Sequence, residues 1–584
     1  MNGLKRPTLH LFSLTFLAST LTFASWTSAE EPSLARYFPD NALMFAEVTD
    51  LKTTLKKIHN SHLLEQILKS PQWQTYTKSP QYKKAYAGKI VVEKQFNTDL
   101  WNFASKLFGK RIAVGLYPQP GNKQPLLLAV IDAEDAKSVE QFRKQIDPFL
   151  AMVGDNVKIE KSSGGSEVIE FGGQLMVAIH SGRMVVSNNK KLFADCRKAL
   201  TGNTGSKLAE NAAYKKMQSQ MKTGHFVSVY LNSKMIANAQ GGHLFPAKLD
   251  NALASLLFGG IAELASKSPY VGFAIDYDND KFQVTASVDG DASKLSPAHR
   301  VFFSSAENSG TDPLPAIPNL IGGVTLHRDI GKWYQQRDNL IAEQTLPDFD
   351  KFEAGIANLL PGKDFGNDVL PTLGTQVTLV SAPQSYSHLN GKPGIQFPGF
   401  AAIFKMAQPK EGSETVQLFF QTLTAILNIQ AGQQGREPWL VKTKTHRDTT
   451  ITYGSYLKKP QGKRLHLVYN FQPAMTQVGS RMILSSSVEL CEQLIDAYKE
   501  GKKTADTINR NLNFRISTNA LANILDANKN FFNSRSIQGG KTPQQAGIEF
   551  QSILKALNLF SHFDLTTTVK KESFQATLVG SWAK

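Results

Sequence analysis

The chain has 584 residues, of which 41% are hydrophobic, 20% charged and 10% aromatic. This composition supplies enough apolar side chains for packed cores and excludes a wholly disordered chain. The chain has only two cysteines, which excludes a disulfide scaffold, an all-cysteine zinc site and a cluster-binding ferredoxin. The formal net charge of +16 makes the protein strongly basic.

The first thirty residues have the polarity order of a secretory signal peptide. Lys5 and Arg6 precede an uncharged, largely apolar stretch over residues 9–24, and the small residues Thr27 and Ala29 offer a cleavage site before Glu30. We expect residues 1–29 to be removed and the chain to be exported to the periplasm, the cell envelope or the extracellular space. Because this segment holds two basic and no acidic residues, the mature net charge is +14. Retention of the segment as a membrane anchor is the alternative.

Residues 30–290 are predicted to alternate strands and helices. An apolar strand that ends at Asp50 precedes a helical run, and strands follow over residues 112–116 and 126–131 before a second helix. Further strand–helix units are predicted from residues 183 and 227. An apolar helix over residues 249–258 and a final hairpin complete this part of the chain.

The same order of elements recurs in the second part of the chain. The matched segments are residues 39–51 with 318–330, 109–118 with 374–383, 183–187 with 481–485, 227–232 with 514–519, and 282–285 with 574–577. Several matches in one order predict that a single module was duplicated.

The fold class predicted from these elements is α+β, in two tandem related halves. Sequential strands joined by short turns favour antiparallel pairing, and the alternation of Phe282, Val284, Ala286 and Val288 predicts a sheet with one apolar face. We therefore expect each half to be a mainly antiparallel sheet with helices packed on one face. The expected divisions are a first repeat over residues 30–290, a stiff linker rich in Ser, Ala and Pro over 291–316, and a second repeat over 317–584.

The two cysteines each lie on a helical pattern of apolar residues. Cys196 lies between Leu192 and Leu200, and Cys491 lies beside Leu490 and Leu494. We expect two buried free thiols, because buried cysteine behaves as a small hydrophobic residue. One bridge between them is the alternative in an exported protein.

Patterns that would indicate a catalytic, nucleotide or metal site are incomplete. The chain has no G-x-S-x-G elbow and no H-E-x-x-H pair. Residues 539–542 (GGKT) look like the end of a phosphate loop, but Arg535 occupies the position of its first glycine. Asp276, Asp278 and Asp280 alternate as calcium ligands do, without the glycine and glutamate of such a loop. We therefore assign no catalytic residue, no cofactor-binding residue and no metal ligand, and we expect no cofactor.

The positive charge is the remaining hint of a partner. Basic residues group at 78–89, 458–464 and 570–571, without the aromatic interleaving of an RNA-recognition strand, so we expect no specific nucleic-acid binding. A solvated cationic surface explains the charge without any partner. The functional interpretation is attraction to an anionic cell-envelope polymer or a membrane surface.

Two stretches resemble a known family. Residues 38–42 (FPDNA) leading into 45–48 (FAEV), and residues 108–114 (FGKRIAV), are similar to exported bacterial proteins described only as a domain of unknown function. Members open with a Pro-Asp strand and later carry a Gly-Arg-strand element, from which this chain departs by the inserted Lys110. The resemblance is clearest in the first half, implies export and a bacterial source, and supplies no catalytic residue.

The sequence leaves three hypotheses for function. The first is an exported, non-enzymatic envelope or periplasmic protein with a duplicated binding or scaffolding module. The second is a carrier of an apolar ligand, with an enclosed pocket lined by residues such as Leu253, Leu257 and Phe273. The third is a hydrolase whose Asp, His or Ser side chains converge in a cleft between the halves.

Overall fold

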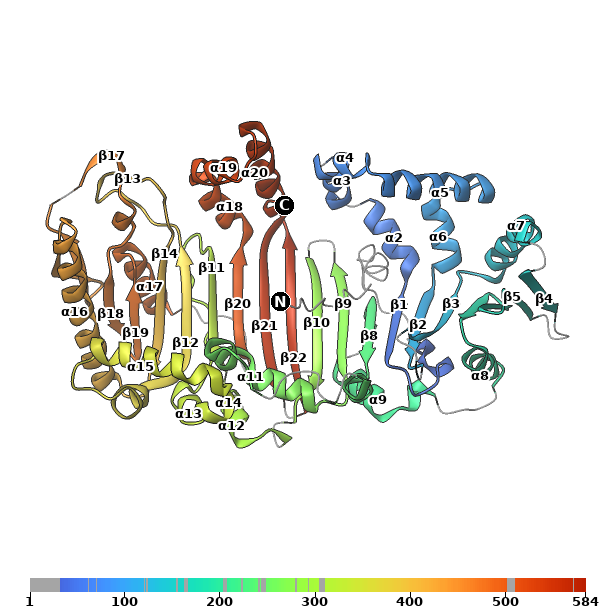
Figure 1. Ribbon diagram of the computed structural model, residues 1–584, viewed down its shortest axis with the longest axis horizontal. Helices are drawn as coiled ribbons and strands as arrows, with labels where there is room; N and C mark the ends of the chain where they lie inside the picture. The colour runs from blue at the N-terminus through green and yellow to red at the C-terminus, as the bar shows by residue number, and fades with distance from the viewer. Residues whose placement is uncertain are drawn as a thin grey trace, which may run out of the picture. The chain divides into compact units, whose positions relative to one another are not determined.

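The structure is a computed structural model. It describes residues 32–583 except 61, 70, 120, 122–123, 154–155, 162–165, 203–206, 222–223, 240–241, 243–247, 279–280, 292–293, 304–309, 459, 502–509 and 571. The predicted signal peptide lies outside the described residues. The chain divides into two compact units, the first formed by residues 1–242 with 269–287 and the second by residues 243–268 with 288–584. Figure 1 labels the elements of both.

The first unit is built on an antiparallel sheet. Strand β1 (Met44–Thr49) pairs with β2 (Arg111–Tyr117) and β8 (Val227–Leu231), β2 pairs with β3 (Leu126–Asp132), and β8 pairs with β9 (Val271–Asp278). Strand β3 pairs with β7 (Arg183–Ser187), which closes the meander β4 (Val157–Lys161), β5 (Glu167–Phe171) and β6 (Leu175–His180). Strand β9 also pairs with β10 (Lys281–Asp289).

The second unit repeats this pattern of pairing. Strand β11 (Gly322–His327) pairs with β12 (Leu373–Ala382) and β20 (Arg510–Ser517), and β12 pairs with β14 (Gly399–Met406). Strand β14 pairs with β19 (Arg481–Ser485), which closes the meander β15 (Trp439–His446), β16 (Thr449–Tyr456) and β18 (Ala474–Val478). Strand β21 (Phe560–Lys570) pairs with β20 and β22 (Ser573–Trp582). Nine pairings thus occur in the same order in both parts of the chain, and the fold is α+β with antiparallel strands, as predicted.

The helices contact both faces of each sheet, which differs from the one covered face that we expected. In β2 the odd-numbered Ala113 and Tyr117 pack in the main core with α8 (Lys190–Leu200) and α9 (Ala212–Met221). The even-numbered Ile112 packs on the opposite face against α2 (Leu51–His59) and α6 (Leu100–Phe108). Successive residues of a strand point to opposite faces, so a strand that is apolar at both phases is covered on both sides.

The remaining helices of the first unit are α3 (His62–Lys69), α4 (Pro71–Tyr76), α5 (Pro80–Phe96), α7 (Ala136–Val153) and α10 (Ser233–Ala239). Helix α5 begins at Pro80 because Ser79 accepts a hydrogen bond from the Tyr82 amide, and it ends at Asn97, whose φ of 46° is left-handed. Gly115 in β2 is required by close packing, because a Cβ there would lie 2.8 Å from the Phe38 ring.

The second unit has α11 (Ala252–Lys267) and α12 (Pro297–Arg300) before its first strand. Helices α13 (Ile330–Gln335), α14 (Arg337–Leu340) and α15 (Leu346–Leu359) join β11 to β12, and α16 (Pro409–Gln433) and α17 (Val488–Glu500) follow β14 and β19. Helices α18 (Thr518–Ala527), α19 (Lys529–Gln538) and α20 (Pro543–Leu557) join β20 to β21. Helices α16 and α17 pack in separate apolar clusters with β14 and β19.

Residues 291–316, which we expected to be a linker, belong to the second unit where the structure describes them. Phe302 is 2% exposed and packs on α11, where a Cβ at Gly260 would lie 2.6 Å from the Phe302 Cβ. Arg328, also 2% exposed, donates from Nε to the Leu256 carbonyl (2.9 Å) and from Nη2 to the Leu257 carbonyl (2.6 Å) of the same helix. Burial lowers the pKa of Arg328 to about 10, so the guanidinium remains charged at neutral pH.

Candidate functional site

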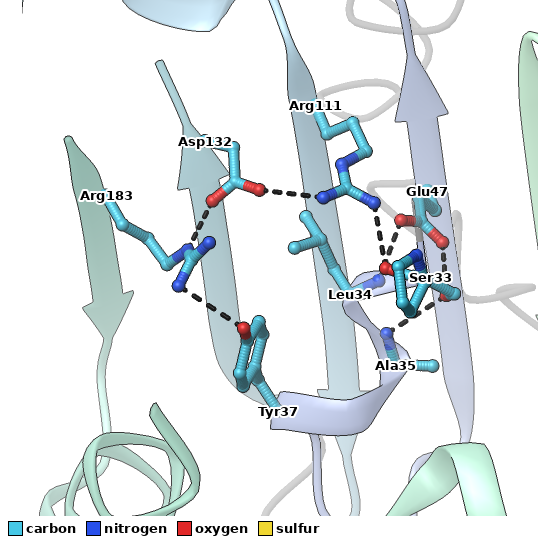
Figure 2. A network of polar contacts seen from close by, with 9 residues as sticks. Ser33, Leu34, Ala35, Tyr37, Glu47, Arg111, Asp132 and Arg183 are labelled. Carbon is cyan, nitrogen blue, oxygen red and sulfur yellow. Dashed lines mark hydrogen bonds and ion pairs between the residues drawn. The ribbon is translucent and has the colours of Figure 1, made fainter. Parts of the chain in front are cut away.

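A row of alternating charges crosses the sheet of the first unit (Figure 2). Arg111 of β2 lies opposite Asp132 of β3, which lies opposite Arg183 of β7. The Arg111 Nη2 atom is 3.1 Å from Asp132 Oδ2, and Arg183 Nε donates to Asp132 Oδ1. Asp132 is 4% exposed, so two guanidinium groups share one buried carboxylate. Burial opposes ionisation of Arg183, but its hydrogen bonds to Asp132 and Tyr37 and the charge of Asp132 together outweigh burial and raise the pKa of Arg183.

This charged row holds the segment that leads into β1. Arg111 Nη1 donates to the Pro32 carbonyl (2.9 Å), and Glu47 of β1 accepts from the Leu34 amide (2.9 Å) and the Ser33 hydroxyl (2.5 Å). The guanidinium of Arg183 lies 4.9 Å from the centre of the Tyr37 ring. The charged side chains therefore form hydrogen bonds with the segment that leads into β1, as Figure 2 shows.

In the second unit the corresponding arginine pairs with a carboxylate of the leading segment instead of one on the neighbouring strand. Arg481 of β19, which occupies the place of Arg183, donates from Nη2 to Asp312 Oδ2 (2.6 Å), and the Asp312 amide donates to Gln376 of β12 (3.0 Å). Partial burial would raise the pKa of Asp312, but the hydrogen bonds from Arg481 and Gln376 and the charges of Arg481 and Lys405 together outweigh burial, so the pKa of Asp312 is lowered. Arg481 also lies 4.8 Å from the centre of the Tyr498 ring. In both units the arginine at this position therefore holds the segment that precedes the first strand.

A groove of about 670 Å³ lies in the second unit, between α19 and the segment that contains β17 (Gln461–Leu465). Strand β17 forms a parallel pair with β13 (Asn390–Pro393). The apolar lining residues are Ile395, Leu465, Leu467, Phe531 and Ile537, and the polar ones are Arg464, His466, Asn530, Asn533 and Ser534. Leu467 is 46% exposed and Phe531 is 38% exposed, so apolar side chains face an open concavity. We call this the groove.

Two asparagines fix the backbone that forms one wall of the groove. Asn470 is 2% exposed; its Nδ2 donates to the Ile395 carbonyl and its Oδ1 accepts from the Phe397 amide, both at 2.8 Å. Asn528 makes the same paired contact with Gln396, donating to its carbonyl and accepting from its amide at 2.8 Å. Each asparagine side chain thus donates to a backbone carbonyl and accepts from a backbone amide of residues 395–397, as a neighbouring strand would. These bonds fix this wall of the groove before any ligand binds.

The groove offers both charge and hydrogen-bonding capacity. The side chains of Arg464 and His466 are exposed, and His466 Nδ1 accepts from the Val468 amide at 3.3 Å. The Oδ1 atom of Asn533 is buried and has no hydrogen-bond partner among the described residues. An unsatisfied buried acceptor costs free energy, so a donor that reached it would be stabilised.

The cluster of Ser296, His299 and Glu263 is not arranged as a proton relay. In the second unit both the Ser296 hydroxyl (2.8 Å) and Glu263 Oε2 (2.9 Å) contact the same His299 nitrogen, Nδ1, whereas a relay needs opposite nitrogens. Burial lowers the pKa of His299. His225 of the first unit lies 2.7 Å from Asp276 Oδ2, and Asp280 lies outside the described residues. No group of three metal-ligating side chains occurs in the parts of the chain that the structure describes.

Both cysteines are free and buried, which confirms that expectation. Desolvation raises the pKa of each of the Cys196 and Cys491 thiols to about 12, so neither is a thiolate nucleophile at neutral pH. Leu253, which we expected to line an apolar pocket, is 63% exposed, and neither it nor Leu257 nor Phe273 lines the groove.

Comparison with known proteins does not assign the chain to a family. No family model matches the chain, and no curated protein matches it. Crystal form IV of TP0453 is similar at a TM-score of 0.24 and 10% identity, over 45% of this chain and 81% of that one. Crystal form III of the same protein gives a TM-score of 0.25 and 10% identity, over 49% and 90%. Similarity at this level does not establish a shared fold.

Proposed function

We propose that the chain is an exported, non-enzymatic binding protein of the periplasm or cell envelope, and that the groove is its ligand site. The groove carries this proposal because it combines a preformed wall with exposed apolar side chains and a few convergent polar groups. Ligand sites of proteins have this composition and are largely formed before binding. We also propose that the chain arose by duplication of one module, which is supported by the nine pairings that the two parts share.

The lining indicates the chemical class of the ligand. Leu465, Leu467 and Phe531 supply an apolar surface, and Arg464 supplies a positive charge beside it. A molecule with an apolar body and one anionic group satisfies both, because its body buries the exposed apolar area while its charge stays near the guanidinium. A donor group on the ligand would add a hydrogen bond to Asn533.

Binding is tested with 1-anilinonaphthalene-8-sulfonate, whose rings and single sulfonate match this class. We expect saturable fluorescence enhancement that Leu467→Asn weakens about fivefold, because about half of a leucine's burial, roughly 1 kcal/mol, is lost. Arg464→Gln should weaken binding by a similar factor and reduce its dependence on salt. The matched controls are Leu440→Asn and Lys442→Gln, which change exposed side chains outside the groove. Equal losses in variants and controls would refute the assignment of the groove.

Export is tested separately by N-terminal sequencing of the chain expressed in a bacterium. We expect a mature chain that begins at Glu30. A signal peptidase requires small residues one and three positions before the cut and tolerates others between them. Ala29→Lys should therefore block processing, while Ser28→Lys should leave it intact. A mature chain that still begins at Met1 in the wild type would contradict export by this route.

A further inference from the structure

The helices between β1 and β2 concentrate positive charge. Residues 51–110, which we call the basic lobe, contain eleven lysines, no arginine and three acidic residues, a net charge of +8. The helices at the equivalent place in the second unit, residues 330–372 between β11 and β12, contain four basic and seven acidic residues, a net charge of −3. The charge is therefore a property of this lobe and not of the fold.

The outer helices of the basic lobe expose apolar side chains. Helices α2 and α6 pack on the sheet, and α3, α4 and α5 lie beyond them on the side away from the strands of this unit (Figure 1). Helix α5 is 17 residues long and has no buried residue. Among the side chains that the structure describes, the large apolar ones exposed in the lobe are Ile67, Leu68, Tyr76, Tyr86, Ile90, Val91 and Leu100.

Lysines flank these apolar side chains on one helix face. In α5 the side chains of Lys83, Ile90 and Lys94 recur at helical spacing, with Tyr86 at 46% and Val91 at 54% exposed beside them. Among the described residues Lys52 pairs with Glu134, Lys69 with Glu65 and Lys89 with Glu93. No ion pair is formed, among the described residues, by Lys56, Lys57, Lys78, Lys83, Lys84, Lys94 or Lys106.

An aromatic cluster adjoins this face. The Trp73 ring lies 5.6 Å from that of Tyr76 and 5.7 Å from that of Tyr82, and Tyr82 stacks on Tyr86 at 5.8 Å. Tyrosine and tryptophan are enriched at the boundary between lipid headgroups and acyl chains, where one end of the ring is wet and the other apolar.

From this arrangement we infer that α3, α4 and α5 dock the protein on the headgroup region of an anionic phospholipid bilayer. Lysines complement the negative headgroups, and the apolar and aromatic side chains between them reach the acyl boundary. A soluble anionic polymer would use the lysines alone, because it offers no apolar phase to the exposed side chains. In the described residues no helix is long and apolar enough to cross a bilayer. The inference does not depend on the groove.

Vesicle flotation tests the inference. The protein used lacks residues 1–29, so that the predicted signal segment does not contribute to binding, and it keeps every residue that the structure describes. We expect binding to vesicles of phosphatidylglycerol and phosphatidylcholine at low salt, and little binding to phosphatidylcholine alone. Lys83→Gln, Lys84→Gln and Lys94→Gln together should lower the partition coefficient about 100-fold. The matched triple control in the second unit, Lys442→Gln, Lys463→Gln and Lys555→Gln, should bind as the wild type does.

A second variant separates a bilayer from a polymer. Replacing Tyr86, Ile90 and Val91 by serine should weaken vesicle binding about 10-fold or more and leave retention on dextran sulfate unchanged. These side chains are exposed, so circular dichroism should show an intact fold. Vesicle binding that is insensitive to this apolar variant would overturn the inference in favour of an anionic polymer. Absence of binding to the anionic vesicles would overturn it outright.

Discussion

His327 at the end of β11 should make the second unit sensitive to mild acid. The pKa of His327 is lowered to about 4, mainly because burial removes water from the imidazole. The positive charges of Arg328 and Lys332 lower this pKa further, and the negative charge of Asp329 opposes them. In the unfolded chain the imidazole titrates near 6.5. Above pH 6.5 both states are neutral and the stability is full, and as the pH falls from 6.5 to 4 only the unfolded state takes up the proton.

The size of the effect follows from the two pKa values. The difference between about 6.5 and about 4, at about 1.36 kcal/mol per pKa unit, gives roughly 3 kcal/mol in total, of which about 2 kcal/mol is lost by pH 5. His327→Gln removes the titrating group and keeps a polar side chain. The difference in the free energy of unfolding between wild type and variant should therefore shift by about 2 kcal/mol in favour of the variant between pH 7 and pH 5.

Urea denaturation at pH 7 and pH 5 measures that difference, and carbon-detected titration of the histidine rings gives the pKa directly. Comparing wild type with variant at each pH cancels the other groups that titrate in this range. A wild-type-minus-variant difference that is the same at both pH values would refute the reasoning. So would a His327 resonance that titrates near pH 6.5 in the native protein.

Three further predictions concern packing, charge and thiols. Gly260→Ala should lower the free energy of unfolding by about 2 kcal/mol, because the added Cβ would clash with the buried Phe302. The control Gly355→Ala in α15, where nothing lies within 4 Å of the added Cβ, should leave the free energy of unfolding unchanged or raise it by up to about 1 kcal/mol. Equal urea midpoints for the two variants would contradict this prediction. Asp132→Asn should cost about 3 kcal/mol or more, because two guanidinium groups lose their shared carboxylate; a midpoint within error of wild type would show that the row does not stabilise the fold. The two cysteine thiols should react with a disulfide reagent only after denaturation, and two equivalents should then be counted; rapid reaction of the native protein would contradict their burial.

The sequence predicts the fold class because local patterns encode it. Apolar strands separated by short turns specify antiparallel pairing, and the pairing found between β6 and β7 or between β21 and β22 has this origin. The expectation of helices on one face was wrong because it rested on one alternating strand. Residues 126–131 (LLLAVI) are apolar at both phases, which is the pattern of a strand covered on both sides.

The candidate sites were less accessible to sequence reasoning. Arg183 and Arg481 stood in matched segments, but their partners Asp132 and Asp312 depend on cross-strand register and on a docked leading segment. The groove brings together stretches near residues 395, 465 and 531, which no spacing rule relates. Leu253 and Leu257, which we named as lining an apolar pocket, do not line the groove, because helical periodicity marks apolar faces without indicating which one is concave.

Because α11 accepts two hydrogen bonds from Arg328, we expect that no single break in the chain gives two fragments that both fold independently. A piece that starts at residue 288 or later would lack the Leu256 and Leu257 carbonyls, which accept from Arg328 Nε and Nη2, and would leave these two donors of a buried guanidinium without their acceptors. Expression of the second unit alone therefore requires residues 248–268 to be carried along, in the same chain or supplied as a separate peptide.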